Sequence, residues 1–272
     1  MSRDTLPLII EPQQLQSCLG DDGFLIVDVC KAGIYHQQHI PGAVHVEYPR
    51  LTASRPPVMG LLPDEQHLAE LFASIGLQPH HHVVAYDEEG GGKASRLLWT
   101  LDVIGHTSFS LLNGGLQAWA REGHPVDNAQ VAPTGRVYPV TISHAMYADR
   151  GYIQAHLHDP SMQLLDARSP GEFSGADVRA RRGGHIPGAV NVEWTRAIDQ
   201  QRNLRLRSLP DLQTMYRNAG LSTDKEVITY CHTHHRSAHT YIVLKWLGYP
   251  RVKGYPGSWS DWGNAADTPI DQ

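Results

Sequence analysis

Residues 39–44 read His-Ile-Pro-Gly-Ala-Val, and residues 185–190 read the same six letters 146 positions later. A short apolar stretch that ends in Asp precedes each copy, at residues 25–28 and at residues 163–166. An identity of six residues is hard to reach by chance, and the stretch before it repeats as well. The chain therefore consists of two similar halves with the same order of elements.

Each half continues with further strand and helix signals. Second apolar strands are predicted at residues 83–87 and 227–231, and third strands around residues 111–112 and 252–254. Segments that open with Pro-Asp, at Pro63 and at Pro210, carry apolar residues at helical spacing. Short strands that alternate with helices predict an α/β fold with two tandem domains, each a parallel sheet flanked by helices.

The stretch between the halves contains several Pro and Gly residues and no usable periodicity, which is typical of a linker. We predict a first domain at residues 1–125, a linker at residues 126–140 and a second domain at residues 141–272. The repeated hexapeptide we interpret as a structural turn, because Pro and Gly fix the backbone after a strand. The chemistry must then come from positions where the copies differ.

Composition places the chain among ordinary globular proteins, with 41% hydrophobic and 19% charged residues. Residues 1–11 lack the features of a signal peptide, and no apolar run is long enough to cross a membrane. The three cysteines, Cys18, Cys30 and Cys231, form no paired framework, which favours a reducing compartment. We therefore expect a cytoplasmic protein with free thiols and no membrane partner.

The net charge of −5 is distributed unevenly. Residues 1–125 hold 7 Lys and Arg against 14 Asp and Glu, whereas residues 126–272 hold 16 against 14, and 13 of those cations are Arg. Arginine suits small oxyanions, while nucleic-acid binding would need a stronger and more clustered basic excess. We expect a small anionic ligand in the second half and no nucleic-acid partner.

The second strands end differently in the two halves. The first runs into Asp-Glu-Glu-Gly-Gly-Gly-Lys at residues 87–93, and the second into Cys-His-Thr-His-His-Arg-Ser at residues 231–237, so that Asp87 aligns with Cys231. Ligands bind outside the carboxyl ends of parallel strands. A helix predicted from about Ser237 to Leu247, together with Arg236, would stabilise a thiolate there. Cys231 is thus the candidate nucleophile.

Three other interpretations of this loop stay open. Cys231 could be a buried structural cysteine. It could bind a metal with His232, His234 and His235, although four ligands within five positions converge poorly on a tetrahedral ion. A phosphatase loop would need five residues between Cys and Arg, and this loop has four. We expect no metal site, and we interpret the histidine run at residues 80–82 as a polar loop.

The chain resembles the two-domain rhodanese family, the thiosulfate and 3-mercaptopyruvate sulfurtransferases. The resemblance rests on the repeated hexapeptide, on the loop at residues 231–236, and on Gly-Ser-Trp-Ser-Asp-Trp at residues 257–262, which is similar to the family's G-S-W-x-E-W. It covers nearly the whole chain. It implies two rhodanese-like domains, a catalytic second one with Cys231 and an inactive first one with Asp87.

The resemblance also implies a reaction. The Cys231 thiolate would take the outer sulfur of thiosulfate, sulfite would leave, and the persulfide would pass its terminal sulfur to cyanide, a thiol or a protein thiol. No metal or organic cofactor is implied. The substrate-binding residues would be those of the loop: His232, Thr233, His234, His235 and Arg236.

The loop departs from the family patterns. Thiosulfate-type members show C-R-x-G-x-[RT] and mercaptopyruvate-type members C-G-S-G-V-T, while this chain has C-H-T-H-H-R. Pro187 stands where some members place a donor-binding Arg, so we expect Arg182 to replace that cation and Trp194 to line the pocket. The charge pattern favours thiosulfate.

Several functions compete with this one. They are a 3-mercaptopyruvate sulfurtransferase, a persulfide carrier for a protein acceptor, and a phosphatase. Because the chain carries its own pair of domains, we expect a monomer.

Overall fold

The computed structural model describes residues 6–133, 135 and 137–272. The start of the N-terminal segment, residues 1–5, and residues 134 and 136 of the predicted linker lie outside the described residues. The chain forms two compact units. The first combines a segment that ends at Leu51 with Pro63–Ile142 and Asp199–Leu206, and the second combines Thr52–Leu62, Ser143–Ile198 and Arg207–Gln272.

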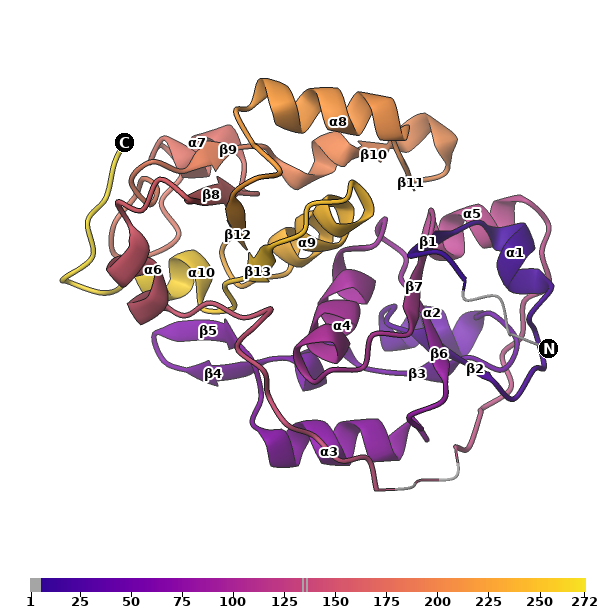
Figure 1. The fold of residues 1–272 in the computed structure, drawn as a ribbon. Coiled ribbons are helices and arrows are strands. Elements are labelled where there is room, and N and C mark those ends of the chain that lie inside the picture. Colours follow the sequence, from indigo (N-terminus) through magenta and orange to yellow (C-terminus); the bar gives the residue numbers. More distant parts are fainter. Residues whose placement is uncertain (1–5, 134, 136) are drawn as a thin grey trace. The chain divides into compact units, whose positions relative to one another are not determined.

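The first unit is built on a five-stranded sheet of order β1-β7-β6-β2-β3, in which all neighbours run parallel. Its strands are β1 (Ile9–Ile10), β2 (Phe24–Asp28), β3 (Val44–His45), β6 (His82–Tyr86) and β7 (Phe109–Leu112). Its helices are α1 (Pro12–Gln16), α2 (Ala32–Gln37), η1 (Tyr48–Leu51), α3 (Glu65–Ser74), α4 (Gly92–Val103) and α5 (Gly115–Arg121), and the returning segment adds η3 (Gln200–Arg202) and β11 (Arg205–Leu206). Figure 1 shows these elements in indigo to magenta, apart from the returning segment.

The second unit holds a four-stranded parallel sheet of order β13-β12-β8-β9. Its strands are β8 (Met162–Asp166), β9 (Val190–Asn191), β12 (Glu226–Tyr230) and β13 (Val252–Gly254), with the hairpin β4 (Ala53–Arg55) and β5 (Val58–Leu61). Its helices are α6 (Arg150–His156), α7 (Pro170–Phe173), η2 (Trp194–Ala197), α8 (Leu209–Asn218), α9 (Arg236–Trp246) and α10 (Ser258–Trp262), and β10 (Ile198–Asp199) lies where the chain leaves this unit.

The two sheets repeat one another. The order β13-β12-β8-β9 corresponds strand by strand to β7-β6-β2-β3. The first sheet has β1 as an additional edge strand, and in the second a single parallel bridge between Tyr147 and Gly254 takes that place. The prediction of two tandem domains with parallel sheets flanked by helices is confirmed.

The repeated hexapeptide is a tight turn tied to the central strand. The glycines of the two copies have φ values of 78° and 76°, a left-handed conformation that costs glycine little. The backbone N–H of Ile40 donates to the Tyr86 hydroxyl at 3.0 Å, and that of Ile186 donates to the Tyr230 hydroxyl at 3.2 Å. The structural interpretation of this motif is confirmed.

The two predicted Pro-Asp helices form with ordinary caps. Asp64 caps α3 by accepting from the N–H of His67, and Ser208 caps α8 by accepting from the N–H of Asp211. Each helix is followed by a glycine in the left-handed region, Gly76 after α3 and Gly220 after α8. Capping and the apolar face together explain why these segments are helical.

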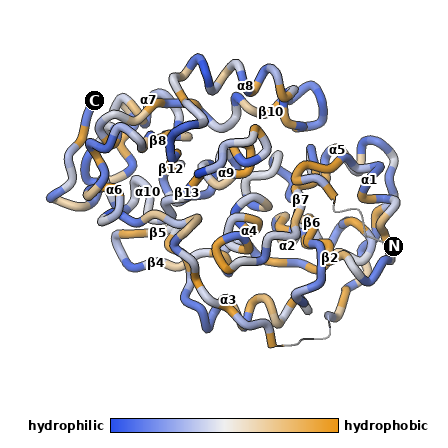
Figure 2. Tube along the Cα trace, viewed as in Figure 1, coloured by the Kyte–Doolittle hydropathy of each residue, from blue (hydrophilic) through white to orange (hydrophobic). Residues whose placement is uncertain are grey.

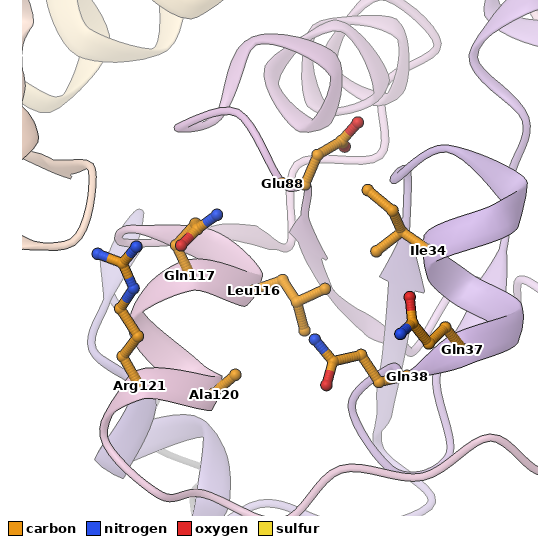
Figure 3. Close-up of a pocket in the computed structure, with 8 residues that line it drawn as sticks. All are labelled: Ile34, Gln37, Gln38, Glu88, Leu116, Gln117, Ala120 and Arg121. Atoms are coloured by element: carbon orange, nitrogen blue, oxygen red, sulfur yellow. The ribbon is translucent and has the colours of Figure 1, made fainter.

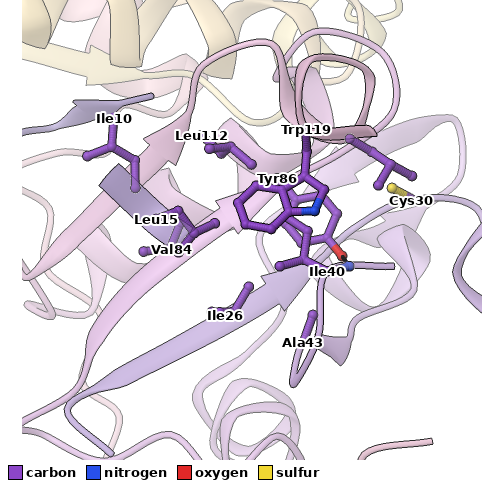
Figure 4. Close-up of a cluster of buried hydrophobic side chains, with 11 residues drawn as sticks. Ile10, Leu15, Ile26, Cys30, Ile40, Ala43, Val84, Tyr86, Leu112 and Trp119 are labelled. Carbon is purple, nitrogen blue, oxygen red and sulfur yellow. Dashed lines mark hydrogen bonds between the residues drawn. The ribbon is translucent and has the colours of Figure 1, made fainter. Parts of the chain in front are cut away.

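The cores lie along the strands, which Figure 2 colours as hydrophobic at β2, β6 and β7. Figure 4 shows the first unit's cluster around Tyr86 and Trp119, with Cys30 at its edge. The interpretation of residues 80–82 as a polar loop is wrong at His82, which begins β6 and is only 9% exposed. Its Nε2 lies 2.7 Å from Ser110 Oγ, and burial lowers its pKa to about 4, so a neutral ring fits the sheet.

The hairpin β4–β5 comes from the first half of the sequence and packs on α10 of the second unit. The Oγ of Ser260 accepts from the N–H of Met59 at 3.0 Å. Nothing in the sequence pattern indicated this exchange. Within the described residues, no helix has the length and hydropathy needed to span a membrane.

Candidate active site

The loop at residues 231–235 joins the carboxyl end of β12 to the N-terminus of α9. Strand β12 lies between β8 and β13, so the loop leaves the middle of the sheet, where parallel α/β folds bind ligands. Cys231 is its first residue and is fully buried. The predicted helix begins at Arg236, and its backbone N–H groups face the loop with partial positive charge.

Helix α10 holds this loop from behind. The N–H of Trp259 donates to the carbonyl of Cys231 at 3.0 Å, and the N–H of Ser260 donates to the carbonyl of His232 at 3.0 Å. The N–H of Cys231 donates to the Ser258 hydroxyl at 3.2 Å. The Gly-Ser-Trp-Ser-Asp-Trp segment at residues 257–262 therefore fixes the backbone of Cys231 and His232.

His234 bends the loop. Its φ of 53° is in the left-handed region, which is uncommon for a residue other than glycine. The ring is buried, and its Nδ1 lies 2.7 Å from Ser237 Oγ. The backbone N–H groups of Thr233 and Ser237 both hydrogen-bond to the Cys231 sulfur, and converging backbone donors of this kind bind anions.

The surroundings of Cys231 favour its thiolate. Burial alone would raise the pKa of the thiol, but the charge of Arg236, hydrogen bonds from the hydroxyl and the N–H of Ser237, and one from the N–H of Thr233 lower the pKa to about 7. A substantial fraction is therefore ionised at neutral pH. A thiol whose pKa is lowered in this way fits a nucleophile better than a purely structural cysteine.

Arg236 is held by a carboxylate that the sequence analysis missed. Its Nη1 and Nη2 donate to Oε2 and Oε1 of Glu172 at 2.5 and 2.9 Å. Burial opposes ionisation of Glu172, but these hydrogen bonds and the Arg236 charge lower its pKa to about 2. Glu172 lies on α7, where it forms a capping box with Ser169. The sequence Ser-Pro-Gly-Glu at residues 169–172 is typical of a capping box and was the signal that could have indicated a helix start here.

A second buried ion pair lies at the end of β8. Arg168 Nε lies 2.9 Å from each carboxylate oxygen of Asp166, and its Nη2 donates to the carbonyl of Gly184 at 2.7 Å. The guanidinium also lies 4.4 Å from the centroid of the Trp259 ring. Because Trp259 bonds to the Cys231 carbonyl, this pair supports the loop from the neighbouring strand.

Trp194 lies beside His235 of the loop and His239 of α9. The centroid of the Trp194 ring is 5.7 Å from that of His235 and 5.3 Å from that of His239 on α9. His232 is half-buried, and burial followed by the charge of Arg236 lowers its pKa, so its ring is neutral at neutral pH. His232 is therefore suited to hydrogen bonding rather than to supplying positive charge.

Arg182 makes its hydrogen bonds elsewhere. Its Nη1 donates to the carbonyl of Thr268 at 2.9 Å and its Nη2 to that of Trp262 at 3.2 Å, with further contacts to Ala265 and to the Thr268 hydroxyl. The guanidinium thus binds the C-terminal segment rather than the loop. Arg179 lies nearer to the loop, because its Nε is 3.7 Å from Oε1 of Glu172, the partner of Arg236.

The loop of the first unit carries a carboxylate in place of the thiol. Asp87 is fully buried; its Oδ1 accepts from the N–H of Glu89 at 2.9 Å and of Gly91 at 2.8 Å, and its Oδ2 from that of Ala94 at 3.0 Å. Beside this loop lies a pocket of about 330 Å³ between α2 and α5, where Figure 3 shows Ile34 and Leu116 surrounded by glutamine side chains. Its eight lining residues include no thiol.

The other cysteines differ from Cys231. Cys30 is buried in the core cluster, and burial, followed by the charges of Asp28 and Asp87, raises the pKa of its thiol. Cys18 is half-buried, and its Sγ lies 3.4 Å from the carbonyl of Gln14.

In residues 6–133, 135 and 137–272, no group of three or more His, Cys, Asp or Glu side chains could hold a metal ion.

Comparison with known proteins assigns the family. Residues 11–122 and 149–265 both match the rhodanese-like domain. The chain is 47% identical over 266 residues to the thiosulfate sulfurtransferase of Pseudomonas aeruginosa, covering 98% of this chain and 97% of that one. It is 45% identical over 267 residues to the thiosulfate sulfurtransferase of Azotobacter vinelandii, covering 98% of each.

A solved structure agrees. SseA from Escherichia coli, described with the rhodanese fold of 3-mercaptopyruvate sulfotransferases, superposes with a TM-score of 0.84 at 26% identity, covering 93% of this chain and 99% of that one. The order of strands, the two matched segments and the full-length relatives all lead to one assignment. The chain belongs to the rhodanese-like family and carries two copies of its domain.

Proposed function

We propose that the protein is a thiosulfate sulfurtransferase and that Cys231 carries the transferred sulfur. The observation that carries this proposal is the setting of the thiol, which is buried in the loop between β12 and α9 with a pKa lowered to about 7. A thiolate available at neutral pH is what attack on a sulfur donor requires. The names of the two full-length relatives support the same reaction.

The reaction proceeds in two halves. The Cys231 thiolate attacks the outer sulfur of thiosulfate; a new S–S bond forms, the donor's S–S bond breaks, and sulfite leaves with the bonding electron pair. Cyanide then attacks the terminal sulfur of the persulfide, thiocyanate leaves, and the Cys231 thiolate is restored. Charge and atoms balance in each half, and no proton or external oxidant is required.

The loop supplies electrostatic stabilisation for both anions. The N–H groups of Thr233 and Ser237 that bond to the thiolate would also serve a sulfur one bond further out, as preorganised donors do in oxyanion holes. Arg236 contributes a permanent positive charge, and its two hydrogen bonds to Glu172 fix the orientation of the guanidinium group. We expect His232, His234 and His235 to contribute to donor binding from the same loop, with Trp194 beside His235.

A test of the proposal measures thiocyanate formed from thiosulfate and cyanide by the wild type and by Cys231→Ala, with intact masses before and after donor alone. We expect turnover, a gain of one sulfur atom, and loss of both in the variant. A sulfur adduct without turnover would favour a carrier for a protein acceptor. No adduct from thiosulfate would overturn the proposed donor.

The second candidate donor is 3-mercaptopyruvate, which the similarity to SseA favours. The two donors differ in charge, since thiosulfate is a dianion and mercaptopyruvate carries one carboxylate. Comparison of kcat/KM for the two donors decides between them. A large preference for mercaptopyruvate would replace our assignment.

We further propose that the first unit is catalytically inactive, because Asp87 stands in the place of the nucleophile. The boundaries at residues 125 and 141 stay predictions. The three unpaired cysteines support a reducing compartment such as the cytoplasm. We also propose that the chain acts as a monomer, which light scattering after size-exclusion chromatography would test.

A further inference from the structure

The β4–β5 hairpin lies directly against the candidate loop. Gly60, in β5, has a φ of 74°. A Cβ atom at this position would lie 2.4 Å from the carbonyl oxygen of Thr233, 2.5 Å from its Cβ and 2.7 Å from its Cα. Two of these three atoms belong to the backbone and cannot rotate away. Any larger residue at position 60 must therefore displace Thr233.

Ser260 joins the hairpin to the same part of the loop. Its Oγ accepts from the N–H of Met59 at 3.0 Å and can donate to the carbonyl of Met59 or of Gly257, each at 2.8 Å. Its own N–H donates to the carbonyl of His232 at 3.0 Å. Ser260 is fully buried and so links the residue before Gly60 to the residue before Thr233.

The contacts of Gly60 and Ser260 fix the position of Thr233, and the N–H of Thr233 hydrogen-bonds to the sulfur of Cys231. We propose that Gly60 and Ser260 are positioning residues, which hold Thr233 where its N–H meets the Cys231 sulfur. The inference deepens the proposed function and rests on it for its biological meaning. The positioning itself is a property of the resting thiol and can be measured without a sulfur donor.

The main test is the pH dependence of iodoacetamide alkylation at Cys231, followed by mass spectrometry on the peptide that contains it. We expect Gly60→Ala to raise the apparent pKa of the thiol by about one unit, the shift that accompanies loss of a hydrogen bond to a charged group. The matched control is Gly220→Ala. Gly220 has a φ of 90°, and a Cβ added there would meet no atom within 4 Å, so this variant reports backbone strain without displacement.

Ser260→Ala provides a second variant that introduces no clash. It removes the hydroxyl that holds Met59 and should shift the pKa of Cys231 in the same direction by a smaller amount. Thermal unfolding followed by circular dichroism confirms that each variant is folded; if Gly60→Ala is not folded, Ser260→Ala decides alone. An unchanged alkylation profile in the folded variants, or an equal shift in Gly220→Ala, would overturn the inference.

Failure of the inference can be distinguished from failure of the proposed function. If the wild type forms no thiocyanate but Gly60→Ala still shifts the alkylation profile, the positioning holds and the assigned reaction is wrong. If the wild type turns over and the profiles coincide, the reaction holds and the positioning is wrong. Rates of thiocyanate formation at matched pH then show whether the altered acidity carries through to turnover.

Discussion

Asp87 and Cys231 occupy corresponding positions, each as the first residue after the matching strand, β6 in the first unit and β12 in the second. In the first unit the carboxylate of Asp87 accepts a hydrogen bond from the N–H of Glu89, and in the second the sulfur of Cys231 accepts one from the N–H of Thr233, two residues on in each case. Each loop therefore directs backbone donors at the side chain in this position. In the first loop these donors bind a carboxyl group, and burial raises its pKa above the ordinary value.

Restoring a thiol to the first loop should not restore activity. Asp87→Cys in a Cys231→Ala background would place the new thiol beside Glu88 and Glu89, whose charges disfavour a thiolate. We expect no thiocyanate above the level of Cys231→Ala alone. Turnover within about tenfold of wild type, roughly 1.4 kcal/mol in activation free energy, would show that the acidic loop is no obstacle.

Reactivity of Cys231 should increase with pH around a midpoint near 7. The thiolate is the nucleophile, so the alkylation rate rises as the proton is lost and levels off above the pKa. A free cysteine would titrate near 8.5, about 1.5 units higher. Stopped-flow or quenched alkylation of the wild type provides the profile, and a midpoint at the free value would contradict our account of the loop.

Glu172→Gln should lower the stability of the protein in a pH-dependent way. The folded pKa of about 2 lies below the ordinary value of 4.5, so the ionised carboxylate stabilises the fold above about pH 4.5, and this contribution is lost as the pH falls toward 2. We expect a loss of up to about 3 kcal/mol in the free energy of unfolding at neutral pH.

Urea unfolding at neutral and acid pH measures the effect. The difference between wild type and Glu172→Gln should shrink as the pH falls below the ordinary pKa of a carboxyl group. Glu70→Gln, on the exposed face of α3, is the matched control and should leave stability nearly unchanged. A difference that does not depend on pH would mean that Glu172 acts through packing and not through its charge.

The three cysteines should separate cleanly by substitution. Cys231→Ser is expected to abolish turnover, because a serine hydroxyl cannot accept and pass on sulfur. Cys18→Ser and Cys30→Ser should retain turnover close to wild type, since burial and nearby carboxylates keep the Cys30 thiol protonated. Thiocyanate assays on the three variants test this, and a loss in either of the latter as large as in Cys231→Ser would refute the assignment.

Arg182→Ala should act on stability and leave donor binding nearly unchanged. The guanidinium binds the carbonyls of Trp262 and Thr268, so its removal frees the C-terminal segment and lowers the Tm. The KM for thiosulfate should change less than about twofold, well under 1 kcal/mol. A large increase in KM with an unchanged Tm would return Arg182 to the donor site where the sequence pattern placed it.

Local patterns predicted the architecture well. The turn in the repeated hexapeptide and the Pro-Asp helix starts depend on residue types within a short stretch of chain, which leave turn and periodic signals. The strand predicted at residues 227–231 is visible as a short apolar run and forms as β12 at Glu226–Tyr230. The loop from Cys231 to Arg236 could be recognised because its residues are consecutive. Their chemistry followed from residue type and from the position after a parallel strand.

The contacts that complete the site are distant in sequence and left no such signal. Glu172 precedes Arg236 by 64 positions, and Ser260 bonds to Met59 across 201 positions. Arg182 is near Pro187 along the chain, yet its side chain contacts the C-terminal segment and not the loop. Residue type alone does not indicate which of several arginines faces a loop, because that depends on how the connecting segments fold.

The exchange of short segments has a consequence for dissecting the molecule. Each unit is assembled from three stretches of chain, so no single cut yields both intact. A fragment that begins at residue 141 would lack the hairpin against Thr233, and one that ends at residue 125 would lack residues 199–206. The repeat visible in the sequence is thus not a repeat of separable parts, and a faithful single-unit version would need its missing segment supplied through a designed linker.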